Sequence, residues 1–249
     1  MKMGITLYSG TSNIVVPIKQ SEYPAEFSGA TRLQYYASLF SSLEVNSSFY
    51  KIPKAATVEK WRESVPSHFR FTFKVPKTVT HAKGLQFSVA EVERFAETVA
   101  HIGDKKGCLL VQLPPSVKRE RQEELEGLLE CLHDDATGWR IAVEFRHNSW
   151  YDRGVYRVLQ GYDATLVIQD LPASAAPPIQ VAEDFAYLRF HGPEGGYRGS
   201  YDKTTLAGYA GRIVEGIKGG KDIYVYFNNT MGDAIGNLQT LNKLIKDGL

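Results

Sequence analysis

Acidic and basic residues recur within short apolar motifs along the chain. Glu44 and Asn46 lie in "LEVNSSFY", and Glu144 and Arg146 lie in "VEFRHNSW". In both motifs polar residues alternate with apolar ones, which indicates β-strands whose two faces differ. A carboxylate beside a basic side chain can act as a general base or help to bind a charged substrate. Such chemistry requires a fold that gathers the polar faces of these strands in one place.

Eight runs of β-branched and aromatic residues, each ending near Gly, Pro, Asn or Asp, predict eight β-strands. We place them at residues 4–10, 41–47, 69–76, 107–114, 140–146, 164–170, 185–192 and 222–229. Amphipathic patterns predict helices in most connections, at residues 31–40, 57–64, 88–103, 118–132 and 204–220. The connection at 171–184 is rich in Pro and Ala and has no apolar stripe, so we expect an irregular crossover between the sixth and seventh strands.

Strand alternating with helix over 249 residues predicts an α/β fold, a single (β/α)8 TIM-type barrel spanning residues 1–249. The first strand is not followed by GxGxxG, which disfavours a doubly wound dinucleotide-binding sheet. No break in composition marks a second domain.

In a barrel, one face of each strand meets the helices and the other fills the interior. The apolar positions of six strands share one parity, which we assign to the outer face. The residues then predicted to point inward near the carboxyl ends of these strands are Glu44, Asn46, Thr72, Lys74, Leu110, Gln112, Glu144, Arg146, Arg189, His191, Tyr226 and Asn228. Tyr8 and Gln169, on the other two strands, fit less cleanly. Barrel enzymes have their active sites at this end.

Buried charges need partners, so the inward groups are expected to pair with one another or with a ligand. Two carboxylates, Glu44 and Glu144, face three cations, which are Lys74, Arg146 and Arg189. A small anion would balance the extra positive charge. We predict catalytic roles for both glutamates, one as general base, and for Lys74 and His191 as acid or electrostatic stabiliser. The structural alternative is a salt-bridge network that holds the barrel mouth together.

Substrate-binding roles are predicted for further residues near the same end. They are Asn46, His81, Gln112, Arg146, Trp150, Arg189, Tyr197, Arg198 and Asn228. Tyr197 and Arg198 belong to the glycine-rich loop after the seventh strand, a region where barrels often bind phosphate. Trp150 either stacks on a substrate or packs a loop onto the barrel rim.

No metal or other cofactor is expected. The histidines have neither HxH nor HExxH spacing, and the inward cations would repel a divalent ion. The alternative is a metal-dependent hydrolase or isomerase with Glu44, Glu144 and His191 as ligands. The two glutamates also suggest a glycosidase pair, but they lie on the second and fifth strands, each beside basic residues, which disfavours that reaction.

Six motifs, in order over essentially the whole chain, resemble the YecE-like family, domain of unknown function 72. They are "LEVNSSFY", "FRFTFKVPKTVTH", "VQLPPS", "VEFRHNSW", "YLRFHG" and "YVYFNN". The resemblance implies a TIM-type barrel but supplies no reaction. It implies that the family's motif positions are occupied by Glu44, Asn46, Lys74, His81, Gln112, Glu144, Arg146, Trp150, Arg189, His191 and Asn228. Family members have a Gly-Thr-Ser-Gly-Trp-like stretch after the first strand. This chain has "YSGTSNIVV" without a tryptophan, so one wall of the pocket is expected to differ.

The 29 Lys and Arg residues nearly balance the 28 Asp and Glu residues, giving a net charge of +1. A general binder of nucleic acids or membrane surfaces would show a larger basic excess. Neither a signal peptide nor a membrane-spanning stretch is recognisable, and the two cysteines suggest no disulfide framework. We therefore expect a cytoplasmic monomer with no membrane association.

The leading hypothesis is a metal-independent hydrolase or isomerase whose substrate is small and anionic, such as a phosphorylated sugar or a nucleotide-like compound. The competing hypothesis is a noncatalytic binder of an anionic metabolite or of a nucleic-acid end.

Overall fold

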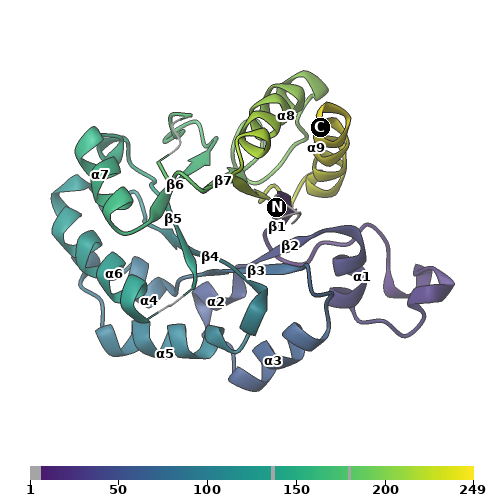
Figure 1. Ribbon diagram of the computed structural model, residues 1–249, viewed down its shortest axis with the longest axis horizontal. Helices are drawn as coiled ribbons and strands as arrows, with labels where there is room; N and C mark the ends of the chain where they lie inside the picture. The colour runs from purple at the N-terminus through teal and green to yellow at the C-terminus, as the bar shows by residue number, and fades with distance from the viewer. Residues whose placement is uncertain (1–6, 136–137, 179–180) are drawn as a thin grey trace.

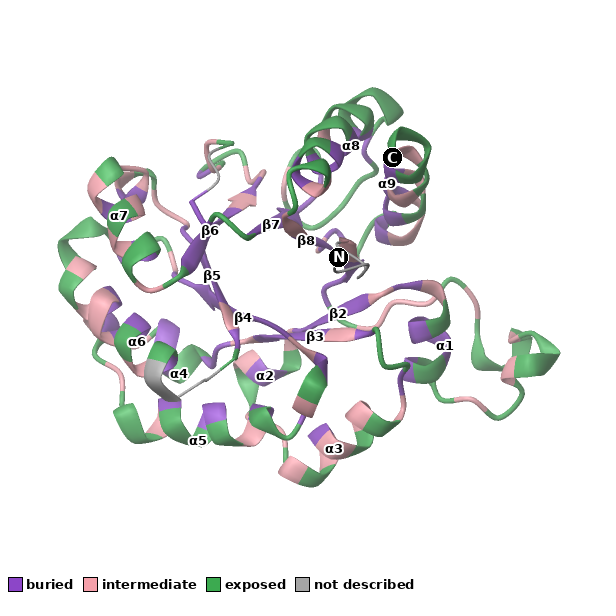
Figure 2. Ribbon diagram, in the orientation of Figure 1, coloured by how far each residue is buried: buried purple, intermediate pink, exposed green. Residues whose placement is uncertain are grey.

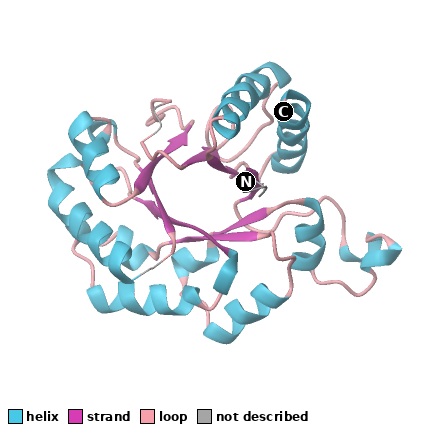
Figure 3. Ribbon diagram, viewed as in Figure 1, coloured by secondary structure: helices cyan, strands magenta, loops and turns pink. Residues whose placement is uncertain are grey.

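Eight parallel strands curve into a ring with helices around its outside (Figures 1 and 3). The computed structural model describes residues 7–135, 138–178 and 181–249. The strands are β1 (Leu7–Thr11), β2 (Ser42–Val45), β3 (Arg70–Lys74), β4 (Lys106–Gln112), β5 (Arg140–Glu144), β6 (Ala164–Gln169), β7 (Phe185–Phe190) and β8 (Asp222–Phe227). Their spatial order is β1-β8-β7-β6-β5-β4-β3-β2. The predicted α/β fold, a (β/α)8 TIM-type barrel, is confirmed.

Helices follow most strands, as the amphipathic patterns predicted. The longer ones are α1 (Arg32–Leu39), α3 (Ala55–Glu63), α5 (Val89–Ala100), α6 (Gln122–Asp135), α7 (Arg153–Gly161), α8 (Lys203–Lys218) and α9 (Ala234–Gly248). Single turns form α2 (Ser47–Tyr50) and α4 (Lys77–Thr80), and 3-10 turns lie at Gln20–Glu22, Ala25–Phe27, Lys83–Leu85, Gly103–Lys105, Arg119–Arg121 and Asn148–Trp150. Among the described helices, none combines the length and apolarity that a bilayer crossing requires.

The ring closes between β1 and β2 through few backbone contacts. The amide of Asn13 donates to the Glu44 carbonyl oxygen at 2.9 Å, and Ser12 and Glu44 form an isolated parallel bridge. The two strands approach closely because Gly10 has no side chain: a Cβ there would lie 1.9 Å from the Ser42 carbonyl oxygen. A glycine is therefore required where the first strand passes the second.

Alternate residues of each strand enter two separate apolar layers. The outer layer, between strands and helices, contains the predicted outward residues such as Phe71, Val143 and Phe190. A smaller cluster fills the barrel interior and consists of Cys108, Leu110, Ala142, Val167, Ala182, Phe185, Tyr187, Tyr224 and Tyr226. Figure 2 shows buried residues along the strands and exposed residues on the outer helix faces. The interior cluster forms a packed floor below the polar mouth, as in other barrels of this size.

The crossover between β6 and β7 has no helix or strand in its described residues, 171–178 and 181–184, as predicted. Buried Gln169 holds it in place: its side-chain oxygen accepts from the Leu171 amide at 2.7 Å, and its amide nitrogen donates to the Ser174 carbonyl oxygen. Gln169 thus serves the crossover, which explains why β6 fits the polar pattern poorly. Positions 4–6 of the first predicted strand and 179–180 of the crossover lie outside the described residues.

Seven of the eight predicted strands extend one or two residues beyond the observed carboxyl ends, and three of these ends bear on the site. β2 ends at Val45, because Asn46 adopts helical backbone angles (φ −76°, ψ −18°) before α2. β7 ends at Phe190, and Gly192 turns the chain with φ +100°. β5 ends at Glu144, so Arg146 lies in a loop. The side chains beyond these ends are placed by turns and not by strand pleating.

Candidate anion site and catalytic centre at the barrel mouth

Arg189, on β7, is the centre of a buried charge cluster at the carboxyl ends of the strands. Its Nε and Nη2 donate to the two carboxylate oxygens of Glu44, at 2.9 and 2.7 Å. Its Nη1 donates to Oε2 of Glu144 at 2.5 Å. Burial alone would lower the pKa of Arg189, but the two glutamates raise it above its ordinary value. The guanidinium therefore stays charged and joins strands on opposite sides of the barrel.

Both glutamates accept hydrogen bonds from several donors. Glu44 also accepts from Ser12 Oγ and from the Tyr187 hydroxyl, each at 2.5 Å. Glu144 also accepts from Nε of Arg146. Burial opposes ionisation of Glu144, but Arg146 and Arg189 hold the pKa of this carboxyl well below its usual range. A carboxylate so stabilised is a weak base, which favours positioning of the arginines as the main role of Glu144.

His191 is fully buried behind the arginines. Its Nε2 lies 3.1 Å from Nη2 of Arg146 and 3.3 Å from Nη1 of Arg189. Guanidinium nitrogens only donate, so Nε2 accepts and the proton of the neutral ring is on Nδ1. That atom lies 3.4 Å from Oδ1 of Asp170. Burial lowers the pKa of His191. A general-acid role for His191 stays a prediction; its buried Nδ1 has no hydrogen-bond partner in the described structure.

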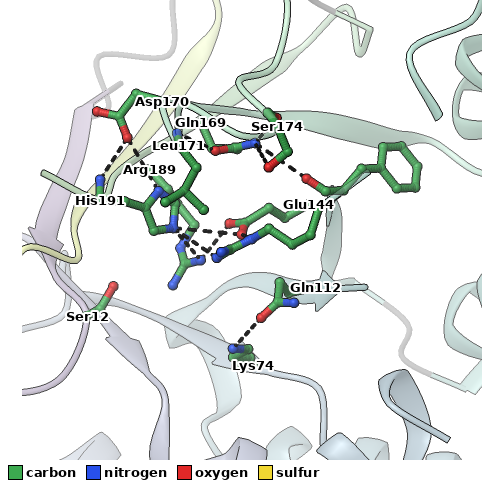
Figure 4. Close-up of polar contacts among 12 residues, drawn as sticks. Ser12, Lys74, Gln112, Glu144, Gln169, Asp170, Leu171, Ser174, Arg189 and His191 are labelled. Carbon is green, nitrogen blue, oxygen red and sulfur yellow. Dashed lines mark hydrogen bonds and ion pairs between the residues drawn. The ribbon is translucent and has the colours of Figure 1, made fainter. Parts of the chain in front are cut away.

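Lys74 occupies the last position of β3, on the other side of the cluster. Its ammonium donates to Oε1 of Gln112 at 2.8 Å and lies 4.0 Å from the centre of the Phe49 ring. In Figure 4, Lys74 and Gln112 lie together, apart from His191 and Asp170. Among the described residues, no carboxylate forms an ion pair with Lys74 within 4.0 Å, in contrast to the two arginines. Burial and the adjacent Arg189 lower the pKa of Lys74 to about 8.

The charges around Arg189 leave a positive excess, as the sequence predicted. Glu44 and Glu144 carry two negative charges against three positive charges on Lys74, Arg146 and Arg189. Asp170 adds a carboxylate, but it lies behind the His191 ring, where it accepts from the Tyr201 hydroxyl and the His191 amide. The excess is therefore on the side of Lys74.

Four predicted binding residues lie around this cluster without a side-chain bond to it. His81 is exposed and packs edge-on against Phe49, with ring centres 4.9 Å apart. Tyr197 packs against His191 at 5.8 Å. Arg198 is exposed in the same loop, and Asn228 is half-buried after β8. Partial burial and the charges of Lys74 and Arg146 lower the pKa of His81, so its ring is neutral at pH 7.

The loop that carries Tyr197 and Arg198 is fixed by its backbone. Tyr197 donates its amide to the His191 carbonyl oxygen at 2.9 Å and accepts from the Met231 amide at 3.1 Å. A Cβ on Gly192 would lie 2.1 Å from the Arg198 carbonyl oxygen. The glycine therefore lets the loop fold back over the mouth.

Two predicted binding residues, Trp150 and Asn46, have surroundings that differ from those of the other residues at the barrel mouth. Trp150 is fully buried: it stacks on outward-facing Phe145 at 4.7 Å and donates its Nε1 proton to the Val117 carbonyl oxygen at 2.8 Å. It thus packs a loop onto the rim, the second of its two predicted roles. Asn46 is half-buried, and its Oδ1 is buried without a hydrogen-bond partner in the described structure. This amide oxygen is therefore a buried acceptor without a partner among the described residues, two positions after Glu44.

Sequence reasoning missed three residues of the site, which are Ser12, Asp170 and Tyr187. Ser12 and Tyr187 donate to Glu44, and Asp170 accepts from Tyr201 behind His191. Tyr187 precedes Arg189 by two positions and shares its parity, so the strand pattern contained this signal. Asp170 directly follows β6, where the polar pattern was obscured by Gln169. In the "YSGTSNIVV" stretch, Ser12 supplies the contact with the mouth, whereas Ile14 lies beside Leu33 and Trp61 outside the barrel.

The fold and the charged mouth define a TIM-type barrel protein with a polar site at the carboxyl ends of its strands. The chain belongs to the family described as "Protein of unknown function DUF72", whose model matches residues 8–248. The resemblance found from the six motifs is thereby confirmed.

Relatives and solved structures agree with this assignment. The chain is 27% identical to the UPF0759 protein YunF of Bacillus subtilis, over 90% of both chains. It is 30% identical to the UPF0759 protein YecE of Escherichia coli over 51% of this chain, a match that spans only about half of that relative, 45% of its length. A DUF72 family protein from Thermotoga maritima has a TM-score of 0.78 at 27% identity, covering 96% of this chain and 99% of the other. One from Enterococcus faecalis has a TM-score of 0.80 at 22% identity, covering 96% and 95%, and supports the fold alone.

Proposed function

We propose that this protein is a metal-independent enzyme that hydrolyses or isomerises a small anionic substrate, such as a phosphorylated sugar or a nucleotide-like compound, at the barrel mouth. The observation that carries this proposal is the ammonium of Lys74, which is paired with a neutral amide beside two arginines that already have their carboxylates. A bound anion would balance this charge in a partly desolvated site, where such an interaction is strong.

Arg146 is the second group available to an anion. Its Nε and Nη2 are engaged by Glu144 and His191, but its Nη1 has no hydrogen-bond partner in the described structure. The Arg146 side chain is 12% exposed, so part of it reaches solvent. The Oδ1 atom of Asn46 supplies an acceptor for a substrate hydroxyl. An anion held by one arginine and one lysine, with a neutral acceptor nearby, suits a phosphorylated or carboxylated polyol.

The donor set supports catalysis without a metal. Every oxygen of Glu44 and Glu144 accepts from an arginine, so coordination of a cation would first require these ion pairs to break. Within the described residues, no three His, Cys, Asp or Glu side chains are arranged to hold a metal ion. Proton transfer then falls to Lys74, whose pKa is lowered toward neutrality, to about 8. The glutamates and His191 hold the arginines in place.

Calorimetric titration with inorganic phosphate at pH 7 tests the anion site. We expect the wild-type protein to bind phosphate and the Lys74→Met variant to bind it at least about tenfold more weakly, because a charged hydrogen bond is worth about 1.5–3 kcal/mol. The matched control is Lys77→Met, since Lys77 is exposed three residues further along. Equal phosphate affinity of all three proteins, or no binding by any, would refute the site.

A turnover assay separates an enzyme from a binder. Wild-type protein and Lys74→Met are incubated with a panel of phosphorylated sugars and nucleotides, and the products are followed by mass spectrometry and phosphorus NMR. We expect conversion of one class by the wild-type protein and loss of conversion in the variant. Binding that depends on Lys74 without conversion of any compound would assign the protein to the noncatalytic binders instead.

A further inference from the structure

The amino group of Lys74 combines three features that set it apart from an ordinary ion-paired lysine. Its hydrogen bond goes to the uncharged side chain of Gln112, at 2.8 Å. Its backbone is tied to α2, because Ser48 Oγ donates to the Lys74 carbonyl oxygen at 2.7 Å. The ring of Phe49 covers one side of the nitrogen at 4.0 Å. The amine is thus held in position and partly dehydrated.

The neighbouring charges increase the fraction of Lys74 that is present as the neutral amine. Arg189 and Arg146 are anchored by Glu144 and Glu44 and do not move away from Lys74 when it is protonated. Their repulsion and the loss of hydration act together against the ammonium, and outweigh the attraction of the Phe49 ring and the carboxylates. A lysine next to other cations in an apolar site is the environment in which amines act as nucleophiles.

We propose that Lys74 forms an imine with an aldehyde or ketone group of the anionic substrate, whose charged end is held by Arg146. This inference deepens the proposed function and rests on it, since the anion site selects the carbonyl compound. It favours isomerisation over hydrolysis, and it makes the substrate an open-chain phosphorylated sugar or a similar oxo compound with an acidic group.

The proposed step is balanced without any further reagent. The lone pair of Nζ forms a bond to the carbonyl carbon, and the carbonyl oxygen takes up a proton to give a carbinolamine. The C–O bond then breaks, and the oxygen leaves as water with one hydrogen of the amine and one proton from the solvent, while the nitrogen keeps its second hydrogen. The resulting protonated imine draws electrons from the neighbouring C–H bond, which is the bond that an isomerisation of a carbonyl compound must break. Hydrolysis of the imine returns Lys74.

Lys105 shows that burial of a lysine is not sufficient. It is also buried, and burial lowers its pKa. However, its Nζ donates to the carbonyl oxygens of Arg62 and Val65, the latter at 2.6 Å, where it binds the end of α3 and the following turn. Lys105 directly precedes β4, so it lies at the opposite end of the barrel from the mouth. Lys105 therefore provides an internal control for accessibility.

Reductive trapping tests the imine. The full-length protein at pH 7 is incubated with glyceraldehyde 3-phosphate and sodium cyanoborohydride, and the modified lysines are mapped by peptide mass spectrometry. Uncharged glyceraldehyde is the matched probe, and Lys74→Met and Lys77→Met are the matched variants. At pH 7 an amine with a pKa of about 8 is neutral roughly 300-fold more often than an ordinary lysine. We expect at least about tenfold more labelling at Lys74 than at Lys77 or Lys105, and stronger labelling by the phosphorylated probe.

The outcomes separate this inference from the proposed function. Labelling of Lys74 that depends on the phosphate group, and that rises with pH to a midpoint of about 8, supports the imine. Equal labelling of Lys74 and Lys77, or equal labelling by the phosphorylated and the uncharged probe, would show unspecific amine chemistry and overturn the imine. Phosphate binding that depends on Lys74 together with an unlabelled Lys74 overturns the imine alone and leaves the anion site standing. Absence of both phosphate binding and labelling refutes both.

Discussion

Replacement of Lys74 by methionine is expected to stabilise the fold while it abolishes function. Methionine keeps most of the aliphatic stem and its contact with Phe49, but it removes an amino group that is dehydrated and lies beside fixed guanidinium groups. Active sites commonly keep a polar group that binds substrate even though this group lowers the folding stability of the free protein.

The magnitude follows from the pKa of Lys74. Its lowering from 10.5 to about 8 corresponds to roughly 3 kcal/mol of unfavourable free energy for the charged form at about 1.4 kcal/mol per tenfold change. Partial solvation of the amine reduces this penalty, and loss of the hydrogen bond to Gln112 costs about 1 kcal/mol. A gain of about 1 kcal/mol in the free energy of unfolding remains for Lys74→Met at pH 7.

The stability gained by Lys74→Met must decrease as the pH rises. The unfolded chain binds a proton at Lys74 below about pH 10.5, whereas the folded protein binds it only below about pH 8. Between these values the unfolded chain holds more protons, so the stability of the wild-type protein rises with pH relative to the variant. The advantage of Lys74→Met should therefore be largest below pH 8 and shrink toward pH 10.5.

Urea unfolding of both proteins at pH 7 and pH 10 measures this difference. Lys77→Met is the control, and its exposed position should change the free energy of unfolding by less than about 0.5 kcal/mol. A Lys74→Met protein that is less stable than the wild type at pH 7 would refute the reasoning, as would an advantage that is the same at both pH values.

Three further changes test the surroundings of the site. Glu44→Gln should lower the free energy of unfolding by about 3–5 kcal/mol, because it leaves buried Arg189 without its bidentate partner. A loss below about 1 kcal/mol, measured by urea unfolding, would contradict the buried ion pair. The lowered pKa of Glu144 contributes stability that is complete above about pH 4.5 and is lost as the pH falls. The melting temperature should therefore fall steeply below pH 4.5, and a flat profile would contradict the assignment. Gly192→Ala should destabilise the loop by about 1–3 kcal/mol, because φ is +100° and the added carbon meets the Arg198 carbonyl oxygen; unchanged thermal unfolding would show that this turn can relax.

The sequence predicted the barrel and the set of inward polar residues because both depend on strand periodicity. Glu44, Lys74, Glu144 and Arg189 share one parity, and a closed barrel brings the carboxyl ends of all its strands together. The identity of the pairs was not predictable in this way. Arg189 bonds Glu44 across 145 positions of the sequence, and periodicity does not determine which inward residues face one another across the barrel.

Local turns account for most of the remaining differences. Asn46 follows the strand pattern in the sequence, but its helical backbone begins α2 and ends β2 early. Trp150 was ambiguous because its partner, the Val117 carbonyl oxygen, is 33 residues away. Asp170 was not predicted, because the neighbouring Gln169 binds the crossover and not the mouth, which obscures the polar pattern of β6. Strand parity identifies which face a residue occupies, whereas loops and turns decide what the side chain contacts.

A crystal structure of the protein soaked with inorganic phosphate at pH 7 tests the central claim most directly. We predict a tetrahedral anion within hydrogen-bond distance of Lys74 Nζ and Arg146 Nη1, with the pairs between Arg189 and the two glutamates intact. A mouth without bound anion while phosphate occupies other surfaces would contradict the account. So would a metal ion coordinated between Glu44 and Glu144 after a parallel soak with divalent cations.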